Sequence, residues 1–475
     1  MFKDLKQAKA FCMEKGIKLI DFKVIDLAGR WHHLTITEGK LNEELMANGI
    51  GFDGSSYGFL TVEKSDMLFK PDLSTGFVDP FMEIPTLCFL TDIYTVGKET
   101  KRYEGDPKYI AEKAEAYLKA SGVADECLLG PEFEFHILDH CSYSNEPHNF
   151  GVKLDNENAE WHSGDECCNN GFKVGYKGGY HVDLPFDNNW ALRNEMVLML
   201  EEAGVPVKYH HPEVGGPGQV EIELSFGSTV QMANRTMILK YIIRNAAVRA
   251  GKTVTFMPKP FYKEAGNGMH VHMIMFKEGQ PVFYDENGYS NMSDIAHYAM
   301  GGILKHSASV MGYTNPSTNS FKRLVPGYEA PVSICYATAN RSAVIRIPGY
   351  ANAPNEKRFE FRPSDATCNP YLAYAGLLMA AMDGINTKID PVKEGYGPYD
   401  VNIFTLPDEE KAKIKGLPTS LDEVADHLEM DNDYLKAGNV FTDGIIRDQL
   451  KRIRKDSKEV SLVPTPYEFK LYYDL

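Results

Sequence analysis

The sequence predicts an α+β fold built from two domains. Short strand-like runs dominate the first hundred residues, and a helical pattern of apolar and small residues then covers 106–120. Beyond residue 130, strand-like segments that carry acids and histidines are separated by helical patterns, which indicates a second domain organised around a sheet. We therefore expect a small N-terminal domain of residues 1–105 and a larger domain of residues 106–475.

Individual elements follow from the same patterns. The runs 19–26 and 30–36, separated by a Leu-Ala-Gly turn, predict a hairpin. Strands are expected at 132–137, 219–224, 268–276 and 343–347, and helices at 190–203, 232–250 and 295–311. The polar stretch 141–177 predicts a long loop or insertion, and the tail 420–475 predicts helices. Within that tail, residues 447–458 alternate in charge, as solvated helices do.

The composition narrows the class of protein. The chain of 475 residues has a formal net charge of −16 and an isoelectric point near 5.4, which disfavours nucleic-acid partners because a phosphate backbone would be repelled. Its longest apolar run, 373–382, is much shorter than the roughly 20 residues of a membrane-spanning helix. Adjacent Cys167 and Cys168 fit either a fragment of a metal site or reduced thiols. We expect a soluble cytoplasmic protein with no membrane partner.

Four strand-like segments repeat one pattern, with charged or histidine side chains on one face and apolar side chains on the other. In the segment GPEFEF at 130–135, Glu132 and Glu134 share a face, either as the wet face of an edge strand or as metal ligands. The other segments place on one face Glu221 with Glu223, His270 with His272, and Arg358 with Glu360 and Arg362. Taken alone, the histidine pair fits a metal site or two hydrogen-bonded surface histidines.

The repetition is more informative than any single segment. Strands paired in one sheet would bring these polar faces together, and Glu213 lies just before the glycine-rich loop 215–218 that precedes Glu221. A carboxylate-rich patch with few thiols suits Mg²⁺ or Mn²⁺ rather than zinc. Nearby arginines suit a phosphate or carboxylate substrate.

These segments, in this order, resemble type I glutamine synthetase from about residue 15 to the end. The matching stretches are FDGSS at 52–56, GPEFEF at 130–135, KGGY at 177–180, HPE at 211–213, GQ at 218–219, GMHVH at 268–272, the long block NPSTNSFKRLVPGYEAPV at 315–332, NRSA at 340–343, IRIP at 345–348 and RFEFR at 358–362. The resemblance implies a β-grasp-like N-terminal domain and a large catalytic domain with a mostly antiparallel sheet and helices. It also implies a dodecamer of two six-membered rings.

The resemblance assigns roles to individual residues. Two or more Mg²⁺ or Mn²⁺ ions would be held by two sets of ligands: Glu134, Glu213 and Glu221, and Glu132, His270 and Glu360. Glutamate would be held by Gly266, Arg323 and Arg362, and the transferring phosphate by Arg341 and Arg346. Ammonium would be surrounded by Asp53, Ser56, Tyr180, Glu213 and Glu329. The ATP co-substrate would lie near Phe226, His272 and Arg358.

Elementary chemistry agrees with those roles. A carboxylate is a poor acyl donor because oxide is a poor leaving group. Phosphorylation of glutamate to γ-glutamyl phosphate makes phosphate the leaving group when ammonia attacks, provided that cations neutralise ATP in the first step. An anionic pocket of Asp53 and Glu329 would bind ammonium, and a carboxylate there would accept its proton. The block that ends near Glu329 is a candidate lid against water. The resemblance further implies that Asp53 completes the site of a neighbouring subunit.

Departures from the family pattern leave the mode of regulation open. Phe404 stands where many type I enzymes carry a tyrosine that is adenylylated, Thr61 stands where a feedback-inhibited subgroup has arginine, and Ile274 replaces a serine near adenine. A γ-glutamyl amine ligase would lose the ammonium pocket, whereas the residues implied for it are present in the sequence, among them Asp53, Ser56, Tyr180 and Glu329. An inactive relative would show broken metal ligands, and a metal-buffering protein would not need the arginines.

Overall fold

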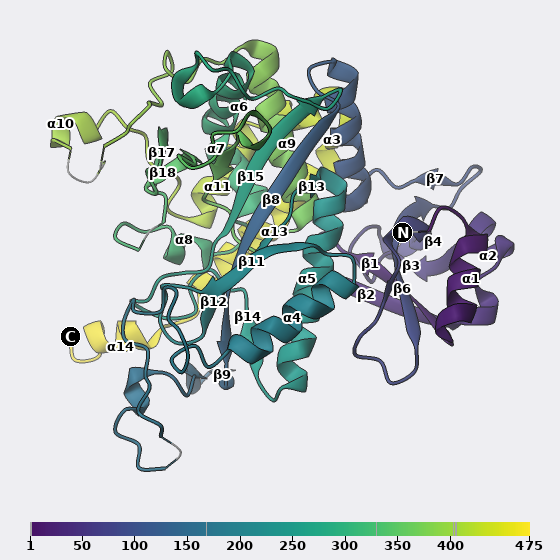
Figure 1. Cartoon of the computed structure of the whole chain (residues 1–475), viewed down its shortest axis with the longest axis horizontal. Coiled ribbons are helices and arrows are strands. Elements are labelled where there is room, and N and C mark those ends of the chain that lie inside the picture. Colours follow the sequence, from purple (N-terminus) through teal and green to yellow (C-terminus); the bar gives the residue numbers. More distant parts are fainter. Residues whose placement is uncertain (1, 168, 329, 402, 404–405) are drawn as a thin grey trace.

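The structure is a computed structural model that describes every residue except 1, 168, 329, 402, 404 and 405. The expected N-terminal hairpin is confirmed: β1 (Leu19–Ile25) and β2 (Trp31–Thr37) pair antiparallel. The small sheet has the order β2-β1-β6-β4-β3, with β6 (Thr86–Thr95) parallel to β1, and β4 (Asp66–Pro71) antiparallel to β3 (Ile50–Asp53). Helices α1 (Leu5–Lys15) and α2 (Glu43–Asn48) lie beside it at one end of the molecule (Figure 1). This sheet has an apolar core of its own, centred on Phe22, Phe69 and Phe89.

The larger sheet is mostly antiparallel, as expected. Its main path runs β11-β12-β8-β15-β19-β18-β17, and only the β17–β18 pair is parallel. The strand bounds are β11 Val207–Pro212, β12 Gln219–Leu224, β8 Glu126–Leu138, β15 Met269–Lys277, β19 Phe359–Phe361, β18 Ala343–Ile347 and β17 Ser333–Thr338. The two long strands β8 and β15 run side by side through the centre of the molecule (Figure 1).

Helices pack against the larger sheet and around a buried central helix. Helix α9 (Pro370–Thr387) contains the longest apolar run of the chain and contacts α3 (Pro107–Ser121), α5 (Thr229–Arg249) and α6 (Asp294–Lys305). Because α9 is apolar all round, it is a core helix. The helix expected at 190–203 is α4 (Trp190–Glu202), whereas the one expected at 295–311 is divided at His306 into α6 and α7 (Ser307–Thr314). No helix among the described residues is long and apolar enough to cross a membrane.

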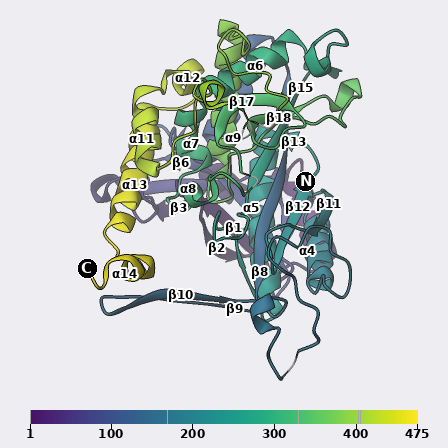
Figure 2. The same ribbon diagram turned by 90° about the vertical axis from the view of Figure 1, so that its left-hand side faces the viewer.

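Two expectations for polar segments need correction. The stretch 141–177, expected as a long loop or insertion, is not a loop throughout. It overlaps a hairpin of β9 (His140–Glu146) and β10 (Asn149–Asp155), which projects from the body beside α14 (Pro466–Tyr472) (Figure 2). Both faces of this hairpin are largely exposed, so its strands do not show the alternation of apolar and polar residues by which a half-buried strand is recognised. Helix α13 (Asp443–Ser461) is not solvated all round, since Ile446 and Ile453 are buried. The boundary between residues 105 and 106 lies between β7 (Lys101–Arg102) and α3 and stays a prediction.

Candidate active site

The strand register brings the polar faces of four segments together. Glu132 on β8 lies opposite Glu223 on β12 and opposite His270 on β15. Glu134 lies opposite Glu221, and Glu360 on β19 lies opposite both His272 and Arg346. The phenylalanines that alternate with the two β8 glutamates, Phe133 and Phe135, are fully buried in the core on the other face. The polar face therefore results from period-two alternation combined with antiparallel pairing.

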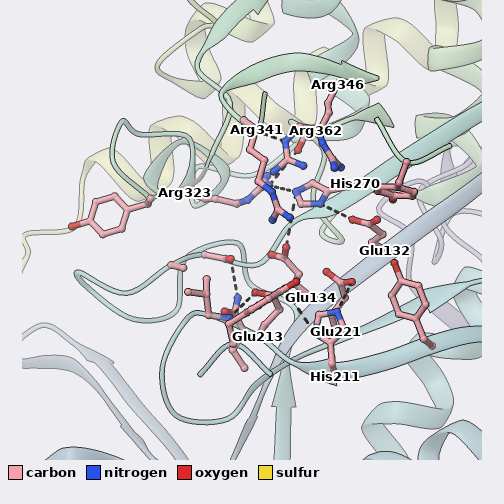
Figure 3. A pocket seen from close by; sticks show the side chains of 18 residues that line it. Glu132, Glu134, His211, Glu213, Glu221, His270, Arg323, Arg341, Arg346 and Arg362 are labelled. Atoms are coloured by element: carbon pink, nitrogen blue, oxygen red, sulfur yellow. Dashed lines mark hydrogen bonds and ion pairs between the residues drawn. The ribbon is translucent and has the colours of Figure 1, made fainter. Parts of the chain in front are cut away.

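Part of this polar face lines a cavity of about 210 Å³. Among the described residues, Glu223, His272 and Glu360 belong to the face but not to the cavity lining. Eleven of the residues assigned by resemblance line it: Glu132, Glu134, Tyr180, Glu213, Glu221, Gly266, His270, Arg323, Arg341, Arg346 and Arg362. In Figure 3 the arginines gather on one side of it, and His211, Glu213 and Glu221 gather on the other. The lining also includes three aromatic residues that the sequence analysis did not select, Tyr209, Tyr328 and Tyr350. Only Tyr209 had a usable signal, since it lies two residues before His211 on β11.

In one half of the cavity, cations compensate the carboxylates. Glu132 accepts hydrogen bonds at 2.9 Å from His270 Nδ1 and at 2.9 Å from His272 Nε2. Burial alone would raise the pKa of Glu132, but the two histidines outweigh it and hold the pKa well below its ordinary value. Glu360 is fully buried between Arg346, at 2.7 Å, and Arg362. Burial alone would raise the pKa of Glu360, but the charges of Arg362, His272 and His270 lower it to about 2.

In the other half, carboxylates gather around Glu221. Burial raises the pKa of Glu221 well above its ordinary value, and the charges of Glu132, Glu134 and Glu213 raise it further. Its neighbour His211 lies with Nε2 at 3.2 Å from Glu221 Oε1, yet burial lowers the pKa of this histidine. A neutral imidazole supplies no full charge, so this half keeps an excess of negative charge.

The donor groups fit divalent metal ions. Ligand atoms of Glu132, His270 and Glu360 lie within 4.8 Å of one another, which is the second set implied by the resemblance. A separate group contains His211, Glu213 and Glu221. Compared with the first set implied by the resemblance, this group has His211 in place of Glu134. Glu134 lies opposite Glu221 in the sheet. Carboxylate oxygens with a minority of imidazole nitrogens suit hard divalent cations, and such an ion would relieve the repulsion around Glu221.

The arginine side of the cavity is rigidly built. Arg323 is buried, and its Nη1 donates to the carbonyl of Pro363 at 2.7 Å. Gly266 packs against it so closely that a Cβ atom there would lie 2.3 Å from the Pro258 carbonyl oxygen and 2.7 Å from Arg323 Cγ. A side chain at position 266 would therefore displace the arginine, which explains the need for glycine.

Several expected residues lie outside the cavity lining. Asp53, in the small domain, accepts hydrogen bonds from the side chains of Ser55 and Ser56, which lower its pKa to about 2, and among described residues neither Asp53 nor Ser56 lines the cavity. Phe226 lies beside the lining, with its ring 6.4 Å from that of His272 and 5.7 Å from Arg358 Cζ. Ile274 is buried on β15, whereas Glu329 and Phe404 lie outside the described residues.

The fold and the cavity define a metal-dependent α+β enzyme that acts on anionic substrates. The chain belongs to the glutamine synthetase family: the family model "Glutamine synthetase, beta-Grasp domain" matches residues 16–96, and "Glutamine synthetase, catalytic domain" matches residues 104–472. The β-grasp expectation for the small domain and the catalytic expectation for the large one are thereby confirmed.

Relatives match over the full length of the chain. A glutamine synthetase of Frankia alni is 44% identical over 480 residues and covers 100% of both chains. One of Mycolicibacterium smegmatis is 42% identical and covers 97% of both. The solved structure of Plasmodium falciparum glutamine synthetase superposes with a TM-score of 0.87 at 27% identity, over 99% of both chains. The similarity therefore extends over both domains.

Proposed function

We propose that this chain joins ammonia to the side-chain carboxylate of glutamate, with ATP converted to ADP and phosphate and γ-glutamyl phosphate as intermediate. The observation that supports it best is the division of one cavity into a carboxylate side and an arginine side. The carboxylate side would bind the cations that accompany a triphosphate. The arginine side would bind the anionic amino acid and the transferring phosphoryl group. Glutamine formation is the reaction of the family to which the chain belongs.

The metal ions would be Mg²⁺ or Mn²⁺. One would be held by Glu134, Glu213 and Glu221, and another by Glu132, His270 and Glu360. When bound, they would neutralise the phosphates of ATP and polarise the transferring group. Two clusters of mainly oxygen ligands fit these hard cations better than zinc.

The arginines on their side of the cavity would bind two different groups. Arg323 and Arg362, together with Gly266, would hold glutamate, while Arg341 and Arg346 would face the phosphoryl group. Arg346 is fixed for this by its ion pair with Glu360. Phe226, His272 and Arg358 would hold the nucleotide next to the Glu132 half of the cavity. Tyr328 lines the cavity immediately before Glu329, in the segment we assign as the lid that excludes water from the acyl phosphate.

Ammonium would bind between two chains. Asp53, Ser56, Tyr180, Glu213 and Glu329 would form its pocket, but Asp53 is exposed in the isolated chain, and among described residues it does not line its own cavity. A dodecamer of two six-membered rings would bring the Asp53 loop of one subunit to the cavity of the next. Asp53 would stay anionic throughout the neutral range, because Ser55 and Ser56 lower its pKa to about 2.

We also propose that the protein is located in the cytoplasm. Cys12, Cys88, Cys127, Cys335 and Cys368 are buried and form no disulfides, which fits the reducing cytoplasm. Cell fractionation with an antibody to this chain would test the assignment, and recovery in a secreted or membrane fraction would contradict it.

An assay of phosphate release tests the chemistry. Purified protein with ATP, glutamate and Mg²⁺ should release phosphate with ammonium and form glutamine, and should respond weakly to methylamine or ethanolamine. Preference for either larger amine would instead indicate a γ-glutamyl amine ligase. Omission of glutamate is the control, because phosphate release without it is simple ATP hydrolysis.

A complementation experiment tests the shared site. Asp53→Ala lacks the ammonium anchor and Arg341→Ala lacks the phosphate contact, so each homo-oligomer should be inactive. When the two are unfolded and refolded together in equal amounts, roughly a quarter of sites should combine a wild-type residue at both positions, because interfaces of one type are equivalent in a closed ring. Verified mixed rings without recovered activity would show that Asp53 acts within its own chain or not at all.

A further inference from the structure

A short loop carries Arg341 to the cavity. It comprises residues 339–342 and joins β17 to β18, which run parallel to each other. Parallel neighbours are usually joined by about a dozen residues or more, so this connection is unusually short. Ala339 has a φ of 60°, in the left-handed region that a residue with a Cβ atom rarely adopts. Such a conformation persists only where surrounding contacts hold it, so the loop requires anchors outside itself.

Asn340, directly before Arg341, is bound to a distant segment of the chain. Its Nδ2 donates hydrogen bonds to the carbonyl of Tyr399 at 3.1 Å and to the carbonyl of Val401 at 2.9 Å. Its Oδ1 accepts from the backbone N–H of Ser342 at 3.0 Å and from the Ser342 hydroxyl at 2.7 Å. The amide therefore uses both donor hydrogens and both acceptor positions. A flipped amide would turn its oxygen toward two carbonyls, so these contacts also fix its orientation.

Asp400, which lies between those two carbonyls in the sequence, binds the residue that precedes the loop. Its Oδ1 accepts a hydrogen bond from the backbone N–H of Thr338, the last residue of β17, at 2.8 Å. The Tyr289 hydroxyl lies 2.7 Å from each Asp400 oxygen and donates to this carboxylate. The Thr338 hydroxyl in turn donates to the Tyr289 oxygen at 2.8 Å. Residues 399–401 therefore hold the chain at two points, Thr338 before the loop and Asn340 within it.

The segment 399–401 is itself fixed, and the loop is also bound from the cavity side. The backbone N–H of Tyr399 donates to the carbonyl of Tyr336 in β17 at 3.0 Å. On the cavity side, Arg362 Nε donates to the carbonyl of Arg341 at 3.2 Å, and both arginines line the cavity (Figure 3). The backbone of Arg341 is therefore held between the edge of the sheet and the active site.

We propose that Asn340 and Asp400 are positioning residues that fix Arg341 toward the transferring phosphoryl group. Among the described residues, neither of them lines the active cavity, so they act through the loop rather than on a substrate. The inference rests on the proposed function, because the position of Arg341 matters only if it contacts that group. A guanidinium presents its donors in a rigid fork, and a misplacement of about 1 Å can lower a rate about a hundredfold. Asn340 should therefore determine kcat rather than substrate affinity.

The substitution Asn340→Asp separates the two roles of the amide. The carboxylate still accepts from Ser342 but cannot donate to the carbonyls of Tyr399 and Val401. It should lower kcat for glutamine formation at least about fivefold and leave the KM values for ATP, glutamate and ammonium within about twofold, as expected when an interaction made only in the transition state is lost.

Asp400→Ala tests the second anchor. It should lower kcat at least about threefold, and by less than Asn340→Asp, because Asp400 contacts the end of the strand rather than the residue next to Arg341. The matched control is Asn386→Asp at the end of α9, where an exposed amide donates to the Tyr117 hydroxyl. This control should have wild-type kinetics.

A double-mutant cycle distinguishes positioning of Arg341 from a general structural role. Arg341→Lys keeps the charge but not the planar fork, and release of radiolabelled phosphate from ATP detects its slow turnover. If Asn340 acts through the guanidinium, adding Asn340→Asp to Arg341→Lys should lower kcat by less than about twofold. The same loss in both backgrounds would overturn the proposal.

Deuterium exchange followed by mass spectrometry reports on the loop without any activity. The peptide covering residues 336–345 should exchange faster in Asn340→Asp and in Asp400→Ala than in the wild-type oligomer, because each variant lacks an anchor. In Asp400→Ala the Thr338 N–H also loses its acceptor. A peptide from α9 should exchange equally in all three proteins. Unchanged exchange of 336–345 in either folded variant would overturn the proposal.

Circular dichroism and thermal unfolding show whether the variants fold. If Asn340→Asp does not fold, Asp400→Ala, which changes an exposed residue, decides the question by the same kinetics, cycle and exchange. A wild type that forms no glutamine would overturn the proposed function and this inference with it. An active wild type with a smaller than about fivefold loss of kcat in folded Asn340→Asp would overturn this inference alone.

Discussion

The two halves of the cavity hold similar acids in opposite electrostatic states. Around Glu132 and Glu360, two histidines and two arginines compensate the carboxylates, and the pKa values of both acids are lowered despite burial. Around Glu221, the neighbours are mostly other carboxylates, and burial together with their charges raises its pKa. Burial has the same sign in both halves, so the difference arises from the neighbours.

In one half of the cavity the protein's own side chains compensate the buried carboxylate charges, whereas in the other half that compensation requires a bound cation. The Glu360 half is already an ion-pair network and gives an incoming substrate fixed arginines. The Glu221 half is a destabilising concentration of negative charge that a divalent cation would relieve. Substitutions in the two halves should therefore affect stability in opposite directions, while both reduce activity.

The largest expected effect is on activity in the carboxylate-rich half. Glu134→Ala removes one ligand beside Glu221 and should reduce glutamine formation at saturating Mg²⁺ by more than about a hundredfold, since changes even one shell further out cost 10–100-fold. The oligomer should stay assembled by size-exclusion chromatography. Glu126→Ala on the same strand serves as the control. Activity within a few-fold of wild type would refute the metal assignment of Glu134.

The same comparison shows how far the sequence could predict the site. Period-two alternation was enough to place Glu132 and Glu134 on one face, and the family resemblance supplied the order of motifs. Neither gives the register, which depends on contacts between distant strands. Glu223 shares a face with Glu221 in the sequence, yet its position opposite Glu132 emerges only from the β12–β8 pairing.

Other features lacked a local signal. Tyr328 and Tyr350 reach the cavity from outside the strands, where no periodicity marks a residue as lining a site. The β9–β10 hairpin is exposed on both faces, so no apolar stripe indicated its strands. In α13 the buried Ile446 and Ile453 are spaced among many charged residues, and the charge pattern concealed the apolar face.

The second prediction concerns the compensated half. Glu360→Gln leaves Arg346 and Arg362 without their shared carboxylate in a buried place. Breaking a buried ion pair by removing one partner typically costs about 3–5 kcal/mol, so metal-free protein should unfold at a clearly lower temperature at pH 7. The loss should shrink toward pH 3, because stability from a depressed carboxyl pKa is lost as pH falls toward about 2. Calorimetry of metal-free wild type and variant would measure this, and equal Tm values would contradict the prediction.

A third prediction applies the same principle, that charged neighbours can outweigh burial, to a histidine outside the cavity. His306, between α6 and α7, contacts Asp383 at 2.8 Å and Asp431 at 2.8 Å. Burial alone lowers its pKa, but the two aspartates raise it above the ordinary value. Stability from a raised histidine pKa is present below pH 6.5 and lost as pH rises through the folded-state pKa. His306→Asn should therefore cost about 3 kcal/mol near pH 6 and less near pH 9, by thermal unfolding at both.

Exposed His427→Asn on α11 (Leu421–Met430) is the control for that measurement, because its charge should affect stability little at either pH. An equal loss of stability in His306→Asn at pH 6 and pH 9 would show that packing, rather than protonation, is the contribution of His306.

The smallest expected effect has the opposite sign and is the sharpest test of the comparison. A buried carboxyl with a raised pKa destabilises the folded state as pH rises above the unfolded value of 4.5, because the unfolded chain ionises first. Glu221→Gln cannot ionise and should stabilise metal-free protein by about 1 kcal/mol near pH 8, with no gain near pH 4. Saturating Mn²⁺ should reverse the order, since wild type gains binding energy that the variant has lost. Exposed Glu202→Gln should show neither effect. If Glu221→Gln instead lowered the metal-free Tm at pH 8, the carboxylate-rich half would be compensated within the protein, and the distinction between the two halves would fail.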